Sequence, residues 1–462
     1  MASTSIEHTY LYPFASQLTE SAAGQKLLLA TSQNDSTFPY FFEGRLIKAR
    51  LSAQLLLGVA KVVSTRYYIP PNVVSKLINR DPVVTAGAEM LRFEGFSACC
   101  SSYIRADFSP ESYNGQFVSN GTTNVDFNQP MQAALARVRD TDRLAVSVGT
   151  NEVLLQRGLE SVIERKVDLP LRWLKGFVEV QSYQSAMELR YDIGRIEALQ
   201  FLRSLPRNPS QRSSFFVVSS GNGLRLSQID SSEAVAVSGL QRLQLLTDLS
   251  PFADRLRIFT DANRQSSEWQ LQFGGTALCI TLTADVTRGF SGEGQVLSDL
   301  KDADFSYLPR IRAALKWQSK INIDSLSEQT SLNTDKVRIG LAIMGSTGMV
   351  GFDVFNKSYF HRELPFDLDN IEGMHPRLKN ARRLLEDGKV TVLSCTTNGA
   401  ELRIVSSDVT HHVKLNGEQA QCTCPWHGKY QGLRGPCKHI LAARLKLADH
   451  STTSKKHEEH RE

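Results

Sequence analysis

Four residues near the carboxyl end of the chain have the types and spacing of a metal site. Cys422 and Cys424 lie two residues apart, and Cys437 and His439 repeat that spacing after a short gap. Thiolates and imidazole nitrogens are preferred ligands of Zn²⁺, and three cysteines with one histidine form a common tetrahedral structural set. The sequence therefore predicts a zinc site made by these four side chains.

His427 is a competing ligand for the same ion. The segment Cys424-Pro-Trp-His427 would also let two ligands reach one metal, so both histidines are candidates. We favour His439, because it stands beside Cys437 and completes a second pair with the spacing of the first. Three bound thiolates leave a Zn²⁺ site with a charge of about −1. Nearby cations can offset that charge, namely Lys429, Arg434 and Lys438.

The elements around these residues must bring the two pairs together. Strands are predicted upstream of the first pair, over residues 390–396, 401–406 and 411–415. Pro425 would help the backbone turn after the first pair. Residues two apart do not share a helix face, so Cys437 should precede a helix that holds His439 in its first turn. Pro436 suits the start of such a helix.

The other histidines of this region have different interpretations. His411 and His412 lie on the third predicted strand, where adjacent side chains point to opposite faces, and we interpret both as structural. The tail of residues 450–462 is polar and is predicted to be disordered. His457 and His460 in that tail could bind metal weakly, as flexible histidine-rich ends often do.

The ligand pattern resembles a known zinc module. Cys-x-Cys followed by Cys-x-His and an apolar helix is similar to the SWIM zinc finger, a ββα module with this ligand order. The resemblance implies that Cys422, Cys424, Cys437 and His439 bind the metal, and no ligand position departs from the pattern. We expect the finger to occupy residues 390–449.

Longer stretches of the chain also resemble bacterial SWIM zinc-finger proteins of about this length. They are LRFEGFSACC, GTTNVDFN, ERKVDLPLRWLKGF, RGFSGEGQVL, YFHRELPFD and CTCPW…GPCKHILAA. Such proteins are usually encoded beside a MoxR-type AAA ATPase and a von Willebrand A protein, so the resemblance implies a multi-component, chaperone-like or stress-linked system. SWIM modules are proposed to bind DNA or proteins. This chain has no ATPase motif, so a partner would have to supply energy.

Residues 308–362 have the element order of a winged helix-turn-helix, with three helices and a two-stranded wing. Asn333 or Thr334 can cap the third helix, which carries Lys336 and Arg338. The third helix enters the major groove in DNA-binding versions, so both cations are candidate nucleic-acid contacts, together with Lys429, Arg434 and Lys438. The wing adds Lys357 and Arg362. The net charge of the segment is only +4, and a packing or protein-docking role is the alternative.

The remaining segments predict an α+β fold class with a large mixed N-terminal body. Residues 1–300 combine helix and strand patterns with many turns, including a hairpin at Gly221-Asn222-Gly223. A polar cluster in this body could line a pocket; it consists of Arg105, Asp107, Asn124 and Asp126. Residues 363–389 are predicted to form a linker and a basic helix with a solvated charged face.

Composition narrows the class of protein. The chain has 462 residues, of which 41% are hydrophobic and 22% charged, which is typical of a globular protein with more than one domain. Seven cysteines, no secretory signal and no apolar run long enough for a membrane helix predict a cytoplasmic protein. The net charge of +5 is uneven, because residues 308–462 carry +6. That excess weakly favours an acidic partner there.

These observations favour a non-catalytic zinc-binding protein that contacts protein partners, DNA or both, in a system with a MoxR-type ATPase. A sequence-tolerant DNA-binding protein that uses the winged helix and the finger is the alternative. An enzyme is less favoured, because four protein ligands would close the zinc site and no HExxH, GxSxG or P-loop motif occurs. We identify no catalytic residue and no small-molecule substrate, although a catalytic site in residues 1–300 would be compatible with the sequence.

Overall fold

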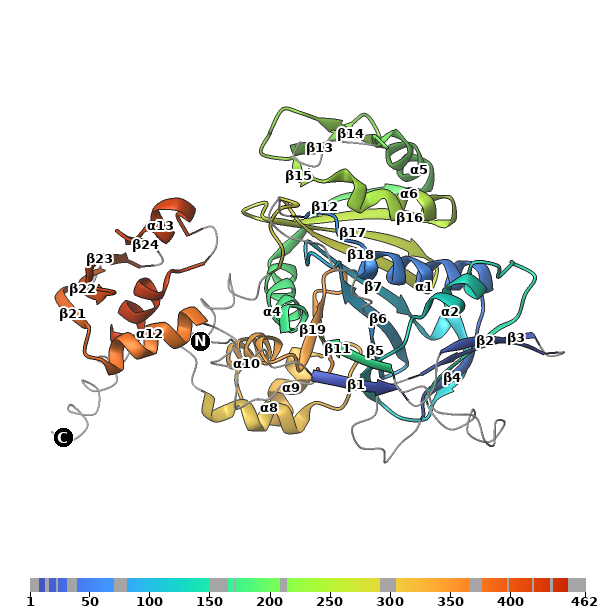
Figure 1. Ribbon diagram of the computed structural model, residues 1–462, viewed down its shortest axis with the longest axis horizontal. Helices are drawn as coiled ribbons and strands as arrows, with labels where there is room; N and C mark the ends of the chain where they lie inside the picture. Colours follow the sequence, from blue (N-terminus) through green and yellow to red (C-terminus); the bar gives the residue numbers. More distant parts are fainter. Residues whose placement is uncertain are drawn as a thin grey trace. The chain divides into compact units, whose positions relative to one another are not determined.

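The computed structural model divides the chain into two compact units (Figure 1). The first consists of Met1–Phe290, Leu315–Asn322 and Met349–Pro365, and the second of Ser291–Ala314, Ile323–Gly348 and Phe366–Glu462. The structure describes residues 8–12, 16–21, 24–30, 40–69, 81–149, 165–169, 171–207, 214–290, 305–364, 376–396, 399–417, 419–432 and 435–447. Within these ranges no helix is both long and apolar enough to cross a membrane.

An antiparallel sheet of eight described strands is the largest element of the first unit. Its order is β12–β16–β17–β18–β7–β6–β5–β9. The strands span Met187–Gly194 (β12), Arg255–Asp261 (β16), Ser266–Phe273 (β17), Thr276–Thr283 (β18), Ser102–Phe108 (β7), Met90–Phe96 (β6), Val83–Gly87 (β5) and Gly121–Asn124 (β9). All residues of β7 and β18 are buried, so the middle of this sheet is covered on both faces. Gly274 lies in the turn between β17 and β18 and has a positive φ of +69°, which favours glycine.

Smaller sheets complete the first unit. A five-stranded sheet has the order β2–β3–β10–β4–β8, β1 pairs with β11, and β13 lies between β14 and β15. Their bounds are His8–Tyr12 (β1), Gln17–Ser21 (β2), Gly24–Leu29 (β3), Tyr40–Leu46 (β4), Tyr113–Phe117 (β8), Leu144–Gly149 (β10), Arg165–Leu169 (β11), Ser214–Ser220 (β13), Gly223–Ser227 (β14) and Val235–Ser238 (β15). The hairpin predicted at Gly221 is confirmed as the β13–β14 turn, with a φ of +58° at that glycine.

The helices of this unit bury apolar stripes against the sheets. They are Ala49–Ser64 (α1), Gln129–Leu135 (α2), Leu171–Ser185 (α4), Arg195–Ser204 (α5) and Gln244–Leu249 (α6). Helix α1 packs on β6 and β7, and its Leu51, Leu55 and Val59 recur at helical spacing and are buried. In α4, Trp173 and Phe177 lie four residues apart, and both are fully buried.

A hairpin from the C-terminal third of the sequence also belongs to the first unit. Its strands span Val350–Asp353 (β19) and Ser358–His361 (β20). Arg105 donates a hydrogen bond of 2.8 Å to the carbonyl oxygen of Phe352. Arg362, which follows β20, forms a 2.8 Å ion pair with Glu94 of β6. Buried polar contacts therefore hold the hairpin to the eight-stranded sheet.

Three short helices precede the finger in the second unit and pack against one another. They span Leu308–Ala314 (α8), Ile323–Thr330 (α9) and Thr334–Ser346 (α10). Of the two candidate caps, Asn333 is the N-cap of α10, because its side chain accepts a 2.8 Å hydrogen bond from the N–H of Lys336. Gly340 allows α10 to approach α8 closely, since a Cβ there would overlap the Ile311 side chain.

The winged helix-turn-helix predicted for residues 308–362 is not confirmed. The helices and the hairpin occur in the predicted order, but the helices belong to the second unit and the hairpin to the first. Element order along the chain cannot show this, because the partners of the hairpin are remote in sequence. Of the two wing cations, Arg362 is buried, and Lys357 donates to the carbonyl oxygen of Met187 and pairs with Glu188.

The C-terminal part of the second unit is a four-stranded sheet with helices on one face. The strands, in sheet order, are Val390–Thr396 (β21), Gly399–Ser406 (β22), Val409–Asn416 (β23) and Gln419–Cys422 (β24). Burial alternates along β22 and β23, so one face is core and the other is exposed. The helices span Pro376–Glu386 (α12), Pro425–Tyr430 (α13) and 438–447. The three predicted strands are β21 to β23, whereas β24 and α13 were not predicted.

Candidate metal centre

The end of a strand and the start of a helix position Cys422 and Cys424. Strand β24 ends at Cys422, and Cys424 is the N-cap residue of α13. The Cys424 Sγ accepts a hydrogen bond of 3.4 Å from the N–H of His427. Pro425 occupies the first helical position, where its fixed φ suits a helix and its missing N–H has little cost. The turn predicted at Pro425 is therefore the beginning of a helix.

Cys437 and His439 are positioned by the start of the last described helix. Cys437 immediately precedes helix 438–447, and its Sγ accepts a 3.5 Å hydrogen bond from the N–H of Ile440. His439 lies in the first turn, as predicted. Cys424 and Cys437 thus each face the amino end of a helix, where the positive end of the helix dipole favours a thiolate.

The four predicted ligand atoms form one compact cluster. One ligand atom from each of Cys422, Cys424, Cys437 and His439 lies within 4.8 Å of all the others, and all four residues are buried. The Nδ1 atom of His439 is 3.7 Å from Cys422 Sγ and 4.0 Å from Cys437 Sγ. Zn–S bonds of about 2.3 Å in a tetrahedron place two sulfurs about 3.8 Å apart. The chemistry and the dimensions of this donor set therefore fit one Zn²⁺ ion.

Hydrogen bonding and burial make the three thiols unequal. The pKa of Cys437 is lowered to about 4, chiefly by a hydrogen bond from the Cys422 thiol and further by His439 and the N–H of Ile440. The hydrogen bond between the two thiols raises the pKa of Cys422, and burial raises the pKa of Cys424. Zinc binds thiolates, so metal binding must displace the protons held by Cys422 and Cys424.

A second histidine packs against the ligand His439. His411 is buried on β23, and its ring centre is 4.2 Å from the ring centre of His439. Burial and the neighbouring His439 lower the pKa of His411, so no second positive charge arises beside the metal at neutral pH. His412 is exposed, which confirms that the two adjacent histidines point to opposite faces.

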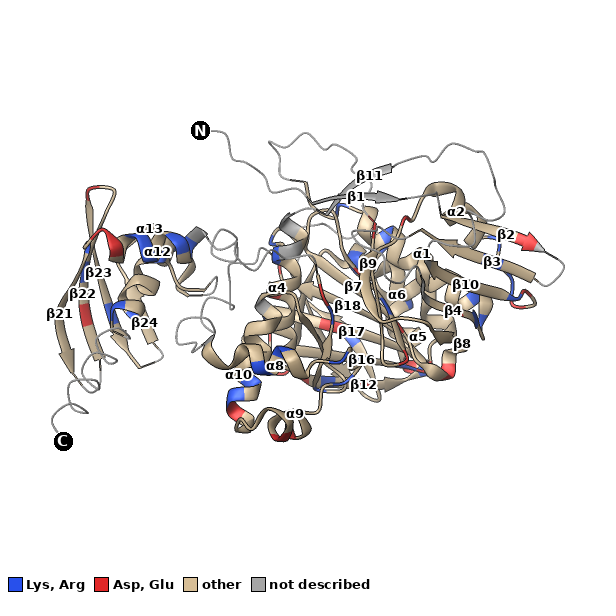
Figure 2. Cartoon of the chain, turned by 90° about the horizontal axis from the view of Figure 1, so that it is seen from below, with Lys and Arg blue, Asp and Glu red and all other residues tan. Residues whose placement is uncertain are grey.

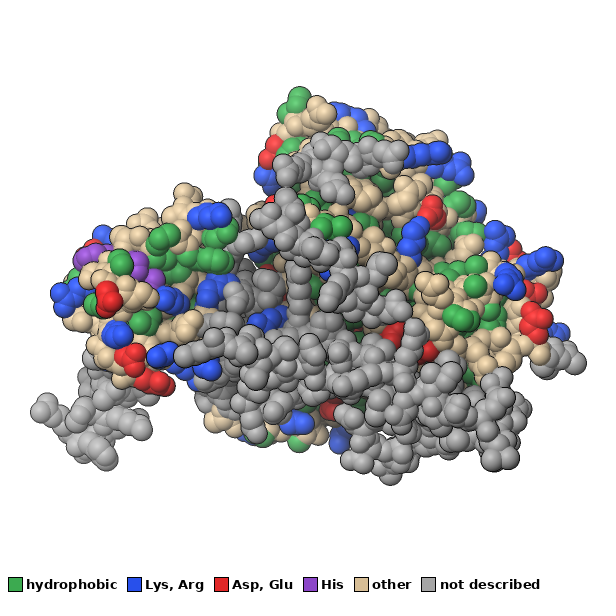
Figure 3. Space-filling model, in the orientation of Figure 1, with side chains coloured by type: hydrophobic (Ala, Val, Ile, Leu, Met, Phe, Trp, Pro, Cys, Tyr) green, Lys and Arg blue, Asp and Glu red, His purple; other side chains and the backbone are tan. Residues whose placement is uncertain are grey.

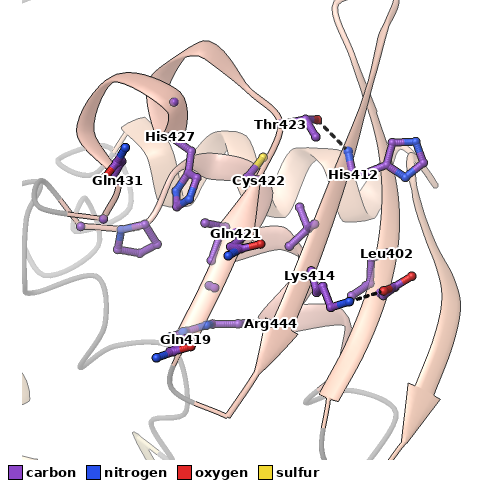
Figure 4. A pocket seen from close by; sticks show the side chains of 18 residues that line it. Leu402, His412, Lys414, Gln419, Gln421, Cys422, Thr423, His427, Gln431 and Arg444 are labelled. Carbon is purple, nitrogen blue, oxygen red and sulfur yellow. Dashed lines mark hydrogen bonds and ion pairs between the residues drawn. The ribbon is translucent and has the colours of Figure 1, made fainter.

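The competing ligand His427 is not part of the cluster found among the described residues. It lies half-buried on α13, and its backbone N–H contacts Cys424. Its side chain lines a pocket beside β24, together with Gln431 and Arg444 (Figure 4). The geometry therefore favours His439 as the fourth ligand.

Four of the five candidate nucleic-acid contacts lie on exposed or half-exposed helix positions. Lys336 and Arg338 are exposed on α10, where Arg338 pairs with Asp335 at 3.3 Å. Lys429 is exposed on α13, and Lys438 is half-buried at the start of helix 438–447. Arg434 lies outside the described residues. Their contact with nucleic acid stays a prediction.

The polar cluster predicted in the N-terminal body is buried in the first unit. The Nε of Arg105 donates a 2.9 Å hydrogen bond to Oδ2 of Asp107, and both residues are buried. Asn124 and Asp126 are also buried, and Asp126 accepts a 3.1 Å hydrogen bond from the N–H of Ser16. Arg105 and Asp107 therefore pair with each other and Asp126 contacts the main chain, whereas no described hydrogen bond reaches the Nδ2 atom of Asn124.

One contact near the site had no signal in the sequence. Arg377, at the start of α12, donates a 2.9 Å hydrogen bond to the carbonyl oxygen of Pro436, and its guanidinium lies 4.7 Å from the ring centre of Trp426. Helix α12 therefore packs into the finger and contacts the segments around both ligand pairs. The helix α13 itself did have a signal, because Pro425 after a capping residue is typical of a helix start.

Comparisons with known proteins place the metal cluster in a family. No curated protein matches the chain. Among solved structures, the chain is similar to the proliferating cellular nuclear antigen from Entamoeba histolytica, with 10% identity, 53% of this chain and 98% of that chain covered, and a TM-score of 0.35. The family model of the SWIM zinc finger matches residues 411–447, which contain all four clustered ligands. Residues 411–447 of this chain are therefore a SWIM zinc finger.

Proposed function

We propose that the protein is a non-catalytic zinc-binding protein whose SWIM finger binds macromolecular partners. The buried Cys3His cluster carries this proposal, since its ligand atoms lie within 4.8 Å of one another. A zinc ion there would join β24, α13 and helix 438–447, which share one small core. Small domains with few buried residues usually need such a link. Zinc would then decide whether the finger is folded.

Four protein ligands favour a structural role for the metal over a catalytic one. A catalytic zinc keeps one coordination position open for water or substrate, whereas three thiolates and an imidazole fill a tetrahedron. The sequence also lacks the HExxH, GxSxG and P-loop motifs. We therefore assign no reaction and no catalytic residue to the finger.

Protein partners are supported by exposed apolar side chains on the strands of the finger's sheet. Leu393, Val405 and Val409 are 50%, 37% and 53% exposed. Exposed apolar side chains contribute to protein-interaction surfaces. The resemblance to bacterial SWIM proteins adds a MoxR-type ATPase and a von Willebrand A protein as partners, in the cytoplasm. A chain without an ATPase motif would depend on such a partner for energy.

DNA binding is the second candidate function. It is supported by the exposure of Lys336 and Arg338 on α10. Retention of the protein on DNA should fall steeply as salt rises, because phosphate contacts release counterions. An absence of retention at low salt would reject this candidate.

Zinc analysis of the purified, reduced chain tests the proposed function. We expect one zinc ion per chain, and we expect Cys422→Ser and Cys437→Ser to lose it, because each removes a ligand. Cys395→Ser is the matched control, since Cys395 is an exposed cysteine on β21 and should be dispensable for zinc. Full zinc content in both ligand variants would reject the assignment.

Capture from the native cell then tests the role of the finger in binding. The full chain and the Cys437→Ser variant would be used as baits under reducing conditions. Proteins or DNA fragments captured by the first bait alone are the partners that need the folded finger. Identical capture by both baits would show that the finger does not mediate the interaction.

A further inference from the structure

The finger and helix α12, which packs on it, form a small domain whose two faces differ in charge. Residues 376–447 contain 12 Lys and Arg but 5 Asp and Glu, a net charge of +7. Eight of these cations lie on α12, α13 and helix 438–447, which together carry a single acidic residue, Glu386. We call these three helices the helical face. Figure 2 shows basic residues along α12 and α13, and Figure 3 shows basic side chains at the surface of the finger.

The packing of α12 directs its cations into solvent. Leu378, Ala381 and Leu384 are buried in the finger core, which fixes the side of the helix that faces the sheet. Lys379 and Arg383 are exposed, and they lie four residues apart, so their side chains are neighbours along one helix stripe. The Arg383 side chain is 76% exposed, and its contact with Asp387 is long, at 4.0 Å. The stripe is therefore a row of cations available to an anionic partner.

The helical face is poor in exposed apolar groups. None of its described residues is among the exposed large hydrophobic side chains, whereas the sheet has three, at Leu393, Val405 and Val409. Trp426 is half-buried, with the Arg377 guanidinium over its ring and the Tyr430 ring centre 4.5 Å away. The indole is thus already engaged in packing within the finger.

We propose that the helical face binds the phosphate backbone of double-helical DNA without sequence preference. The centres of protein interfaces are apolar and depleted of Lys, whereas interfaces with DNA are polar and strongly positive. Proteins that bind single strands use exposed aromatic rings on which bases stack, and the helical face offers none among its described residues. A row of cations without apolar anchors fits duplex phosphates best.

The zinc cluster and this surface are linked through Arg377. Its two contacts are the carbonyl oxygen of Pro436, next to the ligand Cys437, and the ring of Trp426, two residues after the ligand Cys424. Loss of the metal would release both contacts and with them the position of α12. The inference rests on the proposed function in this respect, because the surface forms only in a folded finger.

Fluorescence anisotropy with a short labelled duplex of arbitrary sequence tests the proposal on the full, zinc-loaded chain. We expect binding at low salt with a steep salt dependence. The double variant Lys379→Gln/Arg383→Gln should reduce the slope of log affinity against log salt by about 1.8, since each lost phosphate contact removes about 0.9. The double variant Arg403→Gln/Lys414→Gln is the matched control, because it removes two exposed cations from the sheet and should leave the slope unchanged.

Zinc content is measured in the same samples, so that a failure of the proposed function is recognised separately. A zinc-loaded chain that does not bind the duplex at low salt would overturn the inference and leave the zinc-finger assignment intact. Equal losses in both double variants, or tighter binding of a single strand than of the duplex, would also overturn it. Polyglutamate that competes as well as unlabelled duplex would show that the partner of this face is an acidic protein instead.

Discussion

Three buried arginines of the first unit and Arg383 on α12 are used in opposite ways. In the first unit Arg92, Arg105 and Arg362 are at most 2% exposed and surround the ring of Phe360, at 4.1, 5.5 and 5.7 Å from its centre. On α12, which packs on the finger, the Arg383 side chain is 76% exposed. The difference comes from what packs on each element. The β19–β20 hairpin covers the first group, whereas α12 presents its cations to solvent.

The buried carboxyl groups of the first unit show the energetic cost of desolvation. Burial raises the pKa of Asp107, although Arg105 lies beside it, and burial also raises the pKa of Glu268, although Gln184 and Thr281 donate hydrogen bonds to it. Desolvation therefore outweighs the favourable partners at both carboxyl groups. A buried ionic network of this kind adds little to the free energy of unfolding. Removal of only one partner of an ion pair is nevertheless strongly destabilising, because it leaves the other charge buried and unpaired. We infer that its main effect is to fix where the hairpin docks.

Metal removal should give the largest difference in stability between the finger and the first unit. Structural zinc contributes on the order of 10 kcal/mol to the folding of zinc-finger peptides at neutral pH. A chelator should therefore unfold the finger and leave the first unit folded. Hydrogen exchange would show loss of protection in residues 390–447 and retained protection in 83–108. Retained protection in the finger of a demonstrably zinc-free chain would contradict the role assigned to the metal.

Arg105→Ala should give the next largest effect, a loss of stability in the first unit. The change leaves the carboxyl groups of Asp107 and Asp353 buried without a main partner, which typically costs about 3–5 kcal/mol. Urea unfolding of the first unit would measure the loss, and zinc content should not change. Arg255→Ala is the control, because its pair with Asp192 is largely exposed and its removal should leave stability unchanged. Equal effects of the two substitutions would refute the contrast between buried and exposed arginines.

His411→Ala should give the smallest of these effects. It removes the ring that packs at 4.2 Å on the ligand His439. Loss of a group that orients a ligand commonly lowers metal affinity by about tenfold or more. Competition with a chromogenic chelator would measure the affinity. His412→Ala is the matched control, because the adjacent ring is exposed and should have no influence. An unchanged affinity in His411→Ala would show that the stacked ring is only packing.

The fold was partly predictable from local patterns. The hairpin at Gly221 and a cap at Asn333 or Thr334 depend on residues close in sequence; the hairpin is confirmed, and Asn333 is the cap. The winged-helix interpretation failed to find support because it depended on what the hairpin packs against. Arg362 and Glu94 are 268 residues apart, and no short-range pattern links them.

For the candidate site, local sequence patterns were enough to predict the three cysteine ligands and to limit the fourth ligand to His439 or His427. Cys422, Cys424, Cys437 and His439 are recognisable because ligand chemistry depends on residue type and short spacing, and the structure brings all four together. Only the tertiary structure decided between His439 and His427, placed His411 on the ligand ring, and joined Arg377 to Trp426. It also decided which arginines are buried and which face solvent. Burial is a property of what an element packs against, and that partner is chosen by the whole fold.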